Sequence, residues 1–424
     1  MTVVGIGISA ILQLAFWGAA VMAFVRICKA AAGARDVQLE RSESGARVTP
    51  IGKIILFALG VRLGMLALGY IILWMEHGTA PAWAELIYAF TRGDSRHYLS
   101  LAEIGYSWEE NGRNILLVFF PLYGWLVRAV NLVVNRITVS AYLVSFASFA
   151  AALCYLHRLI RLDFSESVAW WALVLISIAP HAFFFGVPMT ESLFLLTTLA
   201  SLYYIRTHNW PLAGIAGALA IMTRMVGLVL IVVAAIEFAM HTKAFALIKA
   251  GKWAELFRAT LKQGLWILLM LIGLAVYLLL NWYISGDPFR FMYYQYSHWY
   301  NQFAYFGSVL TAQVEHIVHQ PHLAATIFIP NLLAFALTAG MLLWATVKRL
   351  PLAYIAFLLG YTFISYAVSW LLSGGRYMLA AAPLFIFLAH FTARRLIFRI
   401  LVPLALVVGL VLTLRWYLLG GMVF

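Results

Sequence analysis

The sequence predicts an all-helical membrane protein with about twelve transmembrane helices. Of its 424 residues, 64% are hydrophobic and only 11% are charged, and the mean hydropathy is +0.92. Soluble domains average about 25% charged residues, so this composition excludes a water-soluble domain and a disordered chain. The apolar residues also form runs close to the length of about 20 residues that crosses a bilayer as a helix.

The predicted spans are the apolar runs of the chain, which are shorter where helices pack inside the protein. They are 3–25, 53–75, 138–157, 167–186, 190–206, 211–224, 225–240, 264–284, 322–346, 351–372, 377–392 and 399–419. The first run resembles a signal peptide, but its cations Arg26, Lys29 and Arg35 follow the run instead of preceding it. We therefore expect a retained span with the N-terminus outside.

The net charge of +13 is explained by topology and not by a nucleic-acid partner, because Lys and Arg accumulate in cytoplasmic connections. The basic connections are 26–53, 157–163, 241–262, Lys348-Arg349, and Arg394-Arg395 with Arg399. All face the cytoplasm if 118–134 lies on the outer surface as an amphipathic helix, with both termini outside. The open alternative is that 118–134 spans and that 211–240 is one long helix.

This topology leaves two long external connections, 76–137 and 285–321, which are rich in aromatic and ionisable residues. Loops of that length are usually functional. No GxxxxGK[ST] or GxGxxG pattern is present, so no nucleotide site is predicted. Cys28 and Cys154 stand in unrelated segments and imply neither a disulfide framework nor a Cys-based metal site.

The first external connection holds the strongest candidate for catalysis, Asp94, which follows Arg92 and precedes His97 by three residues. If a helix begins at Ser95, Asp94 stands at its N-cap and His97 lies one turn on. A simple helix cap explains Asp94 equally well. A carboxylate beside a His at the membrane surface can instead accept a proton from a hydroxyl nucleophile.

Three further charges lie at span ends on the outer side. Glu191 opens an apolar run after Thr190, where it either meets the positive end of a helix or requires a partner. Arg224 and Arg376 are cations outside, against the charge bias, which favours an anion-binding role over snorkelling. Glycines precede Arg376-Tyr377 and expose backbone donors that suit a phosphate.

Other polar residues have simpler explanations. Asp287, in an Asp-Pro pair, is a turn former or a site residue, and Gln295 follows in the same connection. The sequence predicts no metal site: Glu315, His316, His319 and His322 lack HExxH spacing and fit an interfacial polar helix better.

These motifs resemble a known family. DSRHYLSLAEIGY from Asp94 to Tyr106, followed by FFPLY from Phe119 to Tyr123, is similar to the first-loop signature of the PIG-V-type (GPI mannosyltransferase 2-like) membrane mannosyltransferases of the GT-C glycosyltransferase superfamily. Weaker similarities follow in the family's order: TESLF from Thr190, Thr223 to Leu228, GDPFRF from Gly286 with Gln295 and Trp299, and Arg376-Tyr377 with Pro383 to Phe385. Gly93 replaces the family's usual Trp, and Gly124 replaces a frequent Pro.

The resemblance covers about 53–392 and implies a catalytic unit over 53–424 with juxtamembrane helices in its first external loop. It leaves 1–52 as an extra helix and basic loop. It implies an inverting transfer of mannose from a polyprenyl- or dolichyl-phosphate donor to a lipid or glycan acceptor, with Asp94 as general base. His97, Arg224, Arg376 and Tyr377 would bind the donor, and Arg92, Glu191, Asp287 and Gln295 would support the site or the acceptor. No cofactor or metal is required by the sequence.

Two other functions stay open at this stage. One is a transporter or flippase for lipid-linked sugars, which would place charges at mid-depth of its spans. The other is a GT-C enzyme that uses a different polyprenyl-phosphate sugar. Short loops without N-x-[ST] sites favour a bacterial plasma membrane, with the site facing the extracytoplasmic side and membrane lipids as the surroundings.

Overall fold

The computed structural model describes residues 3–31, 49–107, 112–421 and 423, and this part of the chain is built from helices. The longer helices are α1 (Val3–Ala31), α2 (Ile51–His77), α3 (Trp83–Phe90), α4 (Ser95–Ile104), α5 (Pro121–Val134), α6 (Ile137–Ile160), α7 (Glu166–Ser177), α8 (Glu191–Arg206), α9 (Trp210–Ile221), α10 (Val229–His241), α12 (Trp253–Lys262), α13 (Met270–Ser285), α14 (Arg290–Ser297), α15 (Phe306–His319), α17 (Ile329–Val347), α18 (Leu352–Tyr366), α20 (Ala382–Thr392) and α21 (Leu396–Leu418). The short ones are η1 (Gly105–Ser107), η2 (Ile115–Val118), η3 (Ala182–Gly186), η4 (Met225–Leu228), α11 (Ala244–Lys249), η5 (Gly264–Leu269), α16 (Pro321–Leu323), η6 (Ala324–Phe328), α19 (Gly374–Tyr377) and η7 (Met378–Ala380).

The predicted all-helical membrane architecture is confirmed, but the count of twelve spans is not. In the described residues, six helices are long and apolar enough to cross a membrane, or seven if a bent pair is one span. The predicted span 167–186 is a helix only to Ser177, about 18 Å long at 1.5 Å per residue. The predicted span 377–392 is broken, because Gly374–Ala380 and Ala382–Thr392 are bent by 80°.

The structure decides one of the two open segments and gives the length and packing of the other. The alternative of one helix over 211–240 is wrong, since α9 ends at Ile221 and α10 begins at Val229, with Arg224 extended between them. The turn is tight, because a Cβ at Gly227 would lie 2.9 Å from the Ile221 nitrogen. The segment 118–134 contains α5, which at 14 residues is about 21 Å long and packs on α4 and α6.

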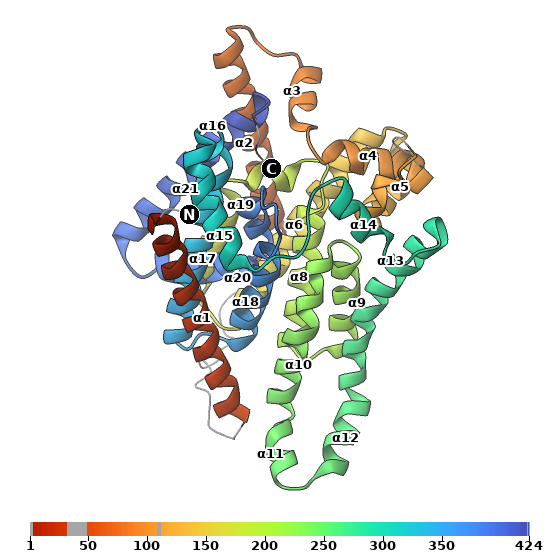
Figure 1. Cartoon of the computed structure of the whole chain (residues 1–424), viewed down its shortest axis with the longest axis vertical. Helices are drawn as coiled ribbons and strands as arrows, with labels where there is room; N and C mark the ends of the chain where they lie inside the picture. The colour runs from red at the N-terminus through yellow and green to blue at the C-terminus, as the bar shows by residue number, and fades with distance from the viewer. Residues whose placement is uncertain (1–2, 32–48, 108–111, 422, 424) are drawn as a thin grey trace.

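The basic connections gather at one end of the molecule, as contacts between them show. Arg26 Nη1 donates to the Leu350 carbonyl at 3.1 Å, and Thr49 Oγ1 donates to Glu166, which also contacts Arg161. The α11–α12 hairpin marks this end in Figure 1, while α3, α4 and α5 lie at the opposite end. Arg35, Arg41 and Arg47 lie outside the described residues.

A buried ion-pair cluster ties helices together at the basic end. Arg206, at the end of α8, donates from Nη2 to Asp163 at 2.6 Å and from Nη1 to Glu237 on α10 at 2.7 Å. Tyr354 of α18 donates its hydroxyl to the other Asp163 oxygen at 2.6 Å. All of these side chains are buried, and they connect the connection after α6 to α8, α10 and α18.

Candidate functional site

Asp94 lies at the N-terminus of α4, at the end of the molecule opposite to the basic connections. The preceding Gly93 has φ +56, a left-handed conformation that is costly for the Trp of the resembled family. Asp94 occupies the predicted N-cap position, but its side chain makes no capping hydrogen bond. Its Oδ2 instead accepts a hydrogen bond from Arg376 Nη1 at 2.9 Å, and the side chain is 37% exposed.

Arg376 is the centre of the site. It stands on the one-turn helix α19, whose entry is anchored by Asn331: the Gly375 amide donates to Asn331 Oδ1 at 3.0 Å, and Asn331 Nδ2 donates to the Leu371 carbonyl at 3.1 Å. The guanidinium is only 5% exposed and lies 4.8 Å from the Phe184 ring centre. Its Nε donates to Glu191 at 2.5 Å, so Arg376 bridges two carboxylates from distant parts of the chain.

Glu191 is fully buried at the start of α8, and a single oxygen serves both arginines. Oε1 accepts from Arg376 and, at 2.6 Å, from Arg224 Nη2. The other oxygen, Oε2, has no hydrogen-bond partner in the described structure. Thr190 does not cap the helix with its side chain, because its hydroxyl accepts from Arg224 Nε at 3.0 Å. Two carboxylates therefore balance two guanidinium groups.

Arg224 reaches this cluster from the break between α9 and α10. Its guanidinium also lies 5.9 Å from the ring centre of Tyr377, which follows Arg376. Tyr98, one turn along α4, places its hydroxyl 3.4 Å from that of Thr190. Burial raises the pKa of Tyr98 to about 12, so this hydroxyl stays protonated at neutral pH.

His97 lies beside the cluster against an aromatic wall shared by both long connections. Its ring stacks on Phe119 of the FFPLY motif at 5.2 Å and meets the edge of Trp299 at 6.2 Å. The connection 285–321 therefore covers the connection 76–137 at this point.

Gly124 lets α5 approach α4 closely, because a Cβ at this position would lie 3.0 Å from Leu101.

Three predicted site residues lie apart from the ion-pair cluster. Arg92 donates from Nη1 to the Tyr417 carbonyl at 3.3 Å, because it lies against the end of α21. Asp287 closes a turn by accepting from the Phe289 amide at 2.9 Å, which is the simpler of its two predicted roles. Gln295 is half-buried on α14 and makes no side-chain hydrogen bond to the described residues. In the described structure, no hydrogen bond or ion pair joins these three side chains to Asp94.

Sequence reasoning missed two kinds of residue. Asn331 and Gln313, which donate to the same Leu371 carbonyl, position Arg376 but lie in helices without a motif.

Arg62 is a charge within the apolar helix α2, and this exception to an otherwise uncharged run was the available signal in the sequence. It is 5% exposed and lies 4.0 Å from the Phe149 ring centre. It donates from Nη1 to the Ala182 carbonyl at 3.2 Å, while Nε and Nη2 have no partner in the described structure.

The polar helix α15 does not assemble the metal cluster that its histidines first suggest. His316 stacks on Phe328 at 5.1 Å and meets the edge of Trp370 at 5.9 Å. Among the described residues, no three His, Cys, Asp or Glu side chains are grouped so that they could hold a metal ion.

The comparisons with known proteins give matches among solved structures alone. The sequence matches no protein-family model and no curated protein. The oligosaccharyltransferase of Archaeoglobus fulgidus in its apo form is 12% identical, with a TM-score of 0.43, and the match covers 90% of this chain and 57% of that one. The same protein tethered with an acceptor peptide has 12% identity, a TM-score of 0.41 and coverages of 87% and 55%. This chain thus spans little more than half the length of those it matches, and the likeness says nothing about the chemistry of the site.

Proposed function

We propose that the protein is an integral membrane glycosyltransferase of the GT-C class that transfers mannose from a polyprenyl- or dolichyl-phosphate donor to a lipid or glycan acceptor. The observation that carries the proposal is the geometry of Asp94. Its carboxylate is partly exposed at the end of the helical bundle, while the arginine that holds it is buried. A base for an incoming hydroxyl needs this combination of access and fixed position.

In the proposed reaction, the acceptor oxygen attacks the anomeric carbon of the sugar from the face opposite to the phosphate, and the configuration inverts. The new carbon–oxygen bond forms as the bond to the phosphate oxygen breaks. Asp94 Oδ1, which makes no hydrogen bond to the described residues, takes the proton of the acceptor hydroxyl. The products are the glycoside and the polyprenyl phosphate.

The two arginines supply the charge that this reaction requires. Negative charge grows on the departing phosphate, and guanidinium groups bind phosphate oxygens well. Arg376 Nη2 and Arg224 Nη1 make no hydrogen bond to the described residues, so both N–H groups are free for a ligand. Because this charge comes from the protein, we expect transfer to persist in the presence of EDTA.

Glu191 is a positioning residue in this proposal. It touches neither substrate, but it fixes both arginines and lowers the cost of burying two like charges together. The resemblance of the motifs around Asp94, Glu191, Arg224 and Arg376 to the PIG-V-type enzymes supports the same assignment. The lack of a nucleotide-binding pattern supports a lipid-phosphate donor. The short loops without N-x-[ST] sites favour the extracytoplasmic side of a bacterial plasma membrane.

The test is a transfer assay with the purified full chain in lipid nanodiscs. Polyprenyl-phosphate-mannose is supplied with a panel of lipid and glycan acceptors, and products are identified by mass spectrometry. Polyprenyl-phosphate-glucose and GDP-mannose are parallel donors. Mannosylated product from the first donor alone is expected. Product from polyprenyl-phosphate-glucose alone would show that the donor sugar is glucose and not mannose. Product from GDP-mannose alone would overturn the assignment of a lipid-linked donor.

Arg62 favours a second candidate, a flippase for lipid-linked sugars, because a buried charge within a span is typical of transport pathways. The two functions separate in proteoliposomes. A flippase moves a fluorescent polyprenyl-phosphate sugar across the bilayer in an Asp94→Asn variant and loses this movement in an Arg62→Leu variant. A transferase shows no such movement in either.

A further inference from the structure

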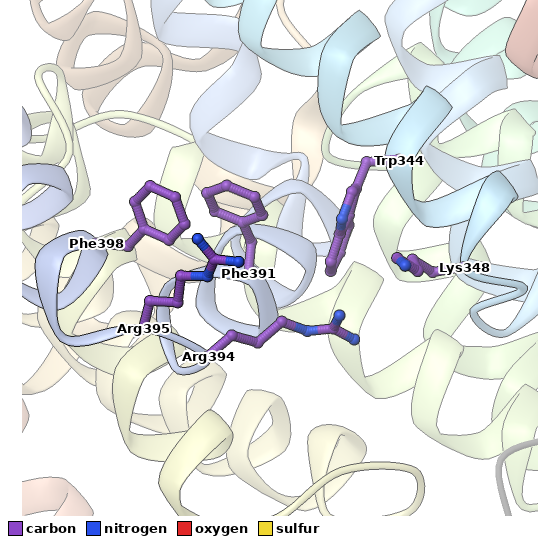
Figure 2. Close-up of a pocket in the computed structure, with 6 residues that line it drawn as sticks. All are labelled: Trp344, Lys348, Phe391, Arg394, Arg395 and Phe398. Carbon is purple, nitrogen blue, oxygen red and sulfur yellow. The ribbon is translucent and has the colours of Figure 1, made fainter.

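A cavity with cationic and aromatic walls opens at the basic end of the molecule, far from Asp94 in the fold. It has a volume of about 330 Å³ and lies where α17, α20 and α21 meet. Figure 2 shows the six lining residues, which are Trp344, Lys348, Phe391, Arg394, Arg395 and Phe398. No motif of the sequence analysis and no part of the proposed function uses this cavity.

The aromatic residues that line the cavity pack against one another. Phe391 stacks on Phe398 with ring centres 4.5 Å apart, and Trp344 meets Phe391 edge-on at 5.6 Å. These three rings are half-buried and form an apolar surface. Arg394 lies with its guanidinium 5.1 Å from the Trp344 ring centre, which holds it at the rim.

The three cations of the cavity have no acidic partner. Lys348, Arg394 and Arg395 are exposed, and none forms an ion pair with any described carboxylate. Arg394 Nη2 donates to His390 Nε2 at 3.0 Å, so this nitrogen is unprotonated and His390 supplies no negative charge. Within the described residues, no carboxylate therefore compensates the three positive charges of the cavity.

Two arginines at the same end are paired with acids. Arg161 pairs with Glu166 at 3.1 Å, and Arg206 pairs with both Asp163 and Glu237. A topology signal alone needs neither a cavity nor aromatic walls. Lys249, Arg258 and Lys262 on the α11–α12 hairpin also form no ion pair with a described carboxylate, but they do not line this cavity. Unpaired cations that line a cavity with aromatic walls indicate an anionic ligand.

The cationic and the aromatic side chains of the cavity indicate the chemistry of its ligand. The cations suit a phosphate, and the rings suit the apolar groups next to it. The helix α21, which supplies Phe398 to the cavity, also carries exposed apolar side chains that would face acyl chains: Ile397, Ile400, Leu401 and Leu404 are all more than half exposed. A free phosphate would use the cations but not this surface.

We propose that the cavity binds the head group of an anionic phospholipid of the cytoplasmic leaflet, with its phosphate among Lys348, Arg394 and Arg395. Basic pockets between helices at this level of a membrane bind such head groups. The proposal does not depend on the proposed transferase function, because the cavity and the Asp94 cluster lie at opposite ends of the helices.

Native mass spectrometry of the delipidated full chain tests the proposal. Phosphatidylglycerol and phosphatidylcholine with identical acyl chains are titrated onto the wild type and onto the triple variant K348Q/R394Q/R395Q. The matched control K249Q/R258Q/K262Q removes three cations from the α11–α12 hairpin, outside any cavity described here. Thermal melting and gel filtration establish that each variant is folded.

The wild type and the control are expected to bind phosphatidylglycerol at least about tenfold more tightly than phosphatidylcholine, and the triple variant to lose this preference. Equal binding of both lipids by the wild type overturns the proposal without any variant. Retention of the preference in the triple variant overturns it as well. Displacement of phosphatidylglycerol by millimolar inorganic phosphate would make the site one for a soluble anion and would also contradict the proposal.

Discussion

The molecule contains two clusters of the same design at its two ends, and they differ in access to solvent. At each end a buried arginine bridges two carboxylates: Arg206 holds Asp163 and Glu237, and Arg376 holds Asp94 and Glu191. In the first cluster all three charged side chains are less than 10% exposed. In the second, the Asp94 side chain is 37% exposed.

This difference separates a structural contact from a candidate site. In the closed cluster every charge is paired and every side chain is buried, so none is accessible to a ligand. Removal of one charge leaves its partner buried and unpaired. The open cluster keeps one carboxylate accessible and free guanidinium N–H groups. We therefore expect substitutions at the Arg206 cluster to change stability and those at the Arg376 cluster to change activity.

The largest effect is expected for Asp94→Asn compared with Asp163→Asn. Loss of the base should lower transfer by about 10²- to 10⁴-fold, with a small change in melting temperature because Asp94 is partly exposed. Asp163→Asn should destabilise the fold by about 3 kcal/mol and leave transfer per folded molecule unchanged. Mass-spectrometric product counts and thermal melting measure the two quantities. Normal transfer by Asp94→Asn would remove its assigned role.

The next effect concerns the two bridging arginines. A lysine ammonium cannot present two separate N–H edges to two carboxylates, so Arg376→Lys should lower transfer by about 100-fold. Arg206→Lys should mainly lower the melting temperature. If Arg206→Lys reduced transfer as strongly as Arg376→Lys in folded protein, the distinction between the clusters would be wrong.

A smaller effect on activity is expected at Glu191. Glu191→Gln leaves the buried Arg224 without a carboxylate partner and Arg376 with Asp94 alone. We therefore expect lower stability by about 3 kcal/mol and reduced kcat. Glu191→Asp keeps the charge and should restore part of the rate. A change in KM with unchanged kcat, or no rescue by Asp, would contradict a positioning role.

The smallest effect is expected for Tyr98→Phe. The hydroxyl contacts Thr190 at a long 3.4 Å, so its loss should reduce transfer by only about threefold to tenfold. Burial disfavours the phenolate and raises the pKa of Tyr98 to about 12, so the hydroxyl stays neutral from pH 6 to 10. The pH–rate profiles of variant and wild type should therefore have the same shape. An alkaline limb that disappears in the variant would show that Tyr98 titrates.

Much of the fold was predictable from the sequence, because apolar runs must be helical in a bilayer where every backbone polar group needs an internal partner. The separation of α9 from α10 was predicted because it lets the basic connections 157–163 and 241–262 lie on the same side of the membrane. The shortening of α7 and the 80° bend before α20 were not. In those segments the backbone leaves the helix inside the protein, and hydropathy does not register such a break.

The sequence by itself determined that this is an all-helical membrane protein. It also singled out the charged residues that the charge bias could not explain, among them Asp94, Glu191, Arg224 and Arg376, because a charge at an unexpected position can be recognised without a structure. Tertiary structure alone decided which of them meet. Asp94 and Arg376 are 282 positions apart and come together because Asn331, a residue without a motif, anchors the turn before Arg376. Arg92 and Asp287 carry the same kinds of charge but are engaged by their local surroundings, and local sequence does not distinguish the two outcomes.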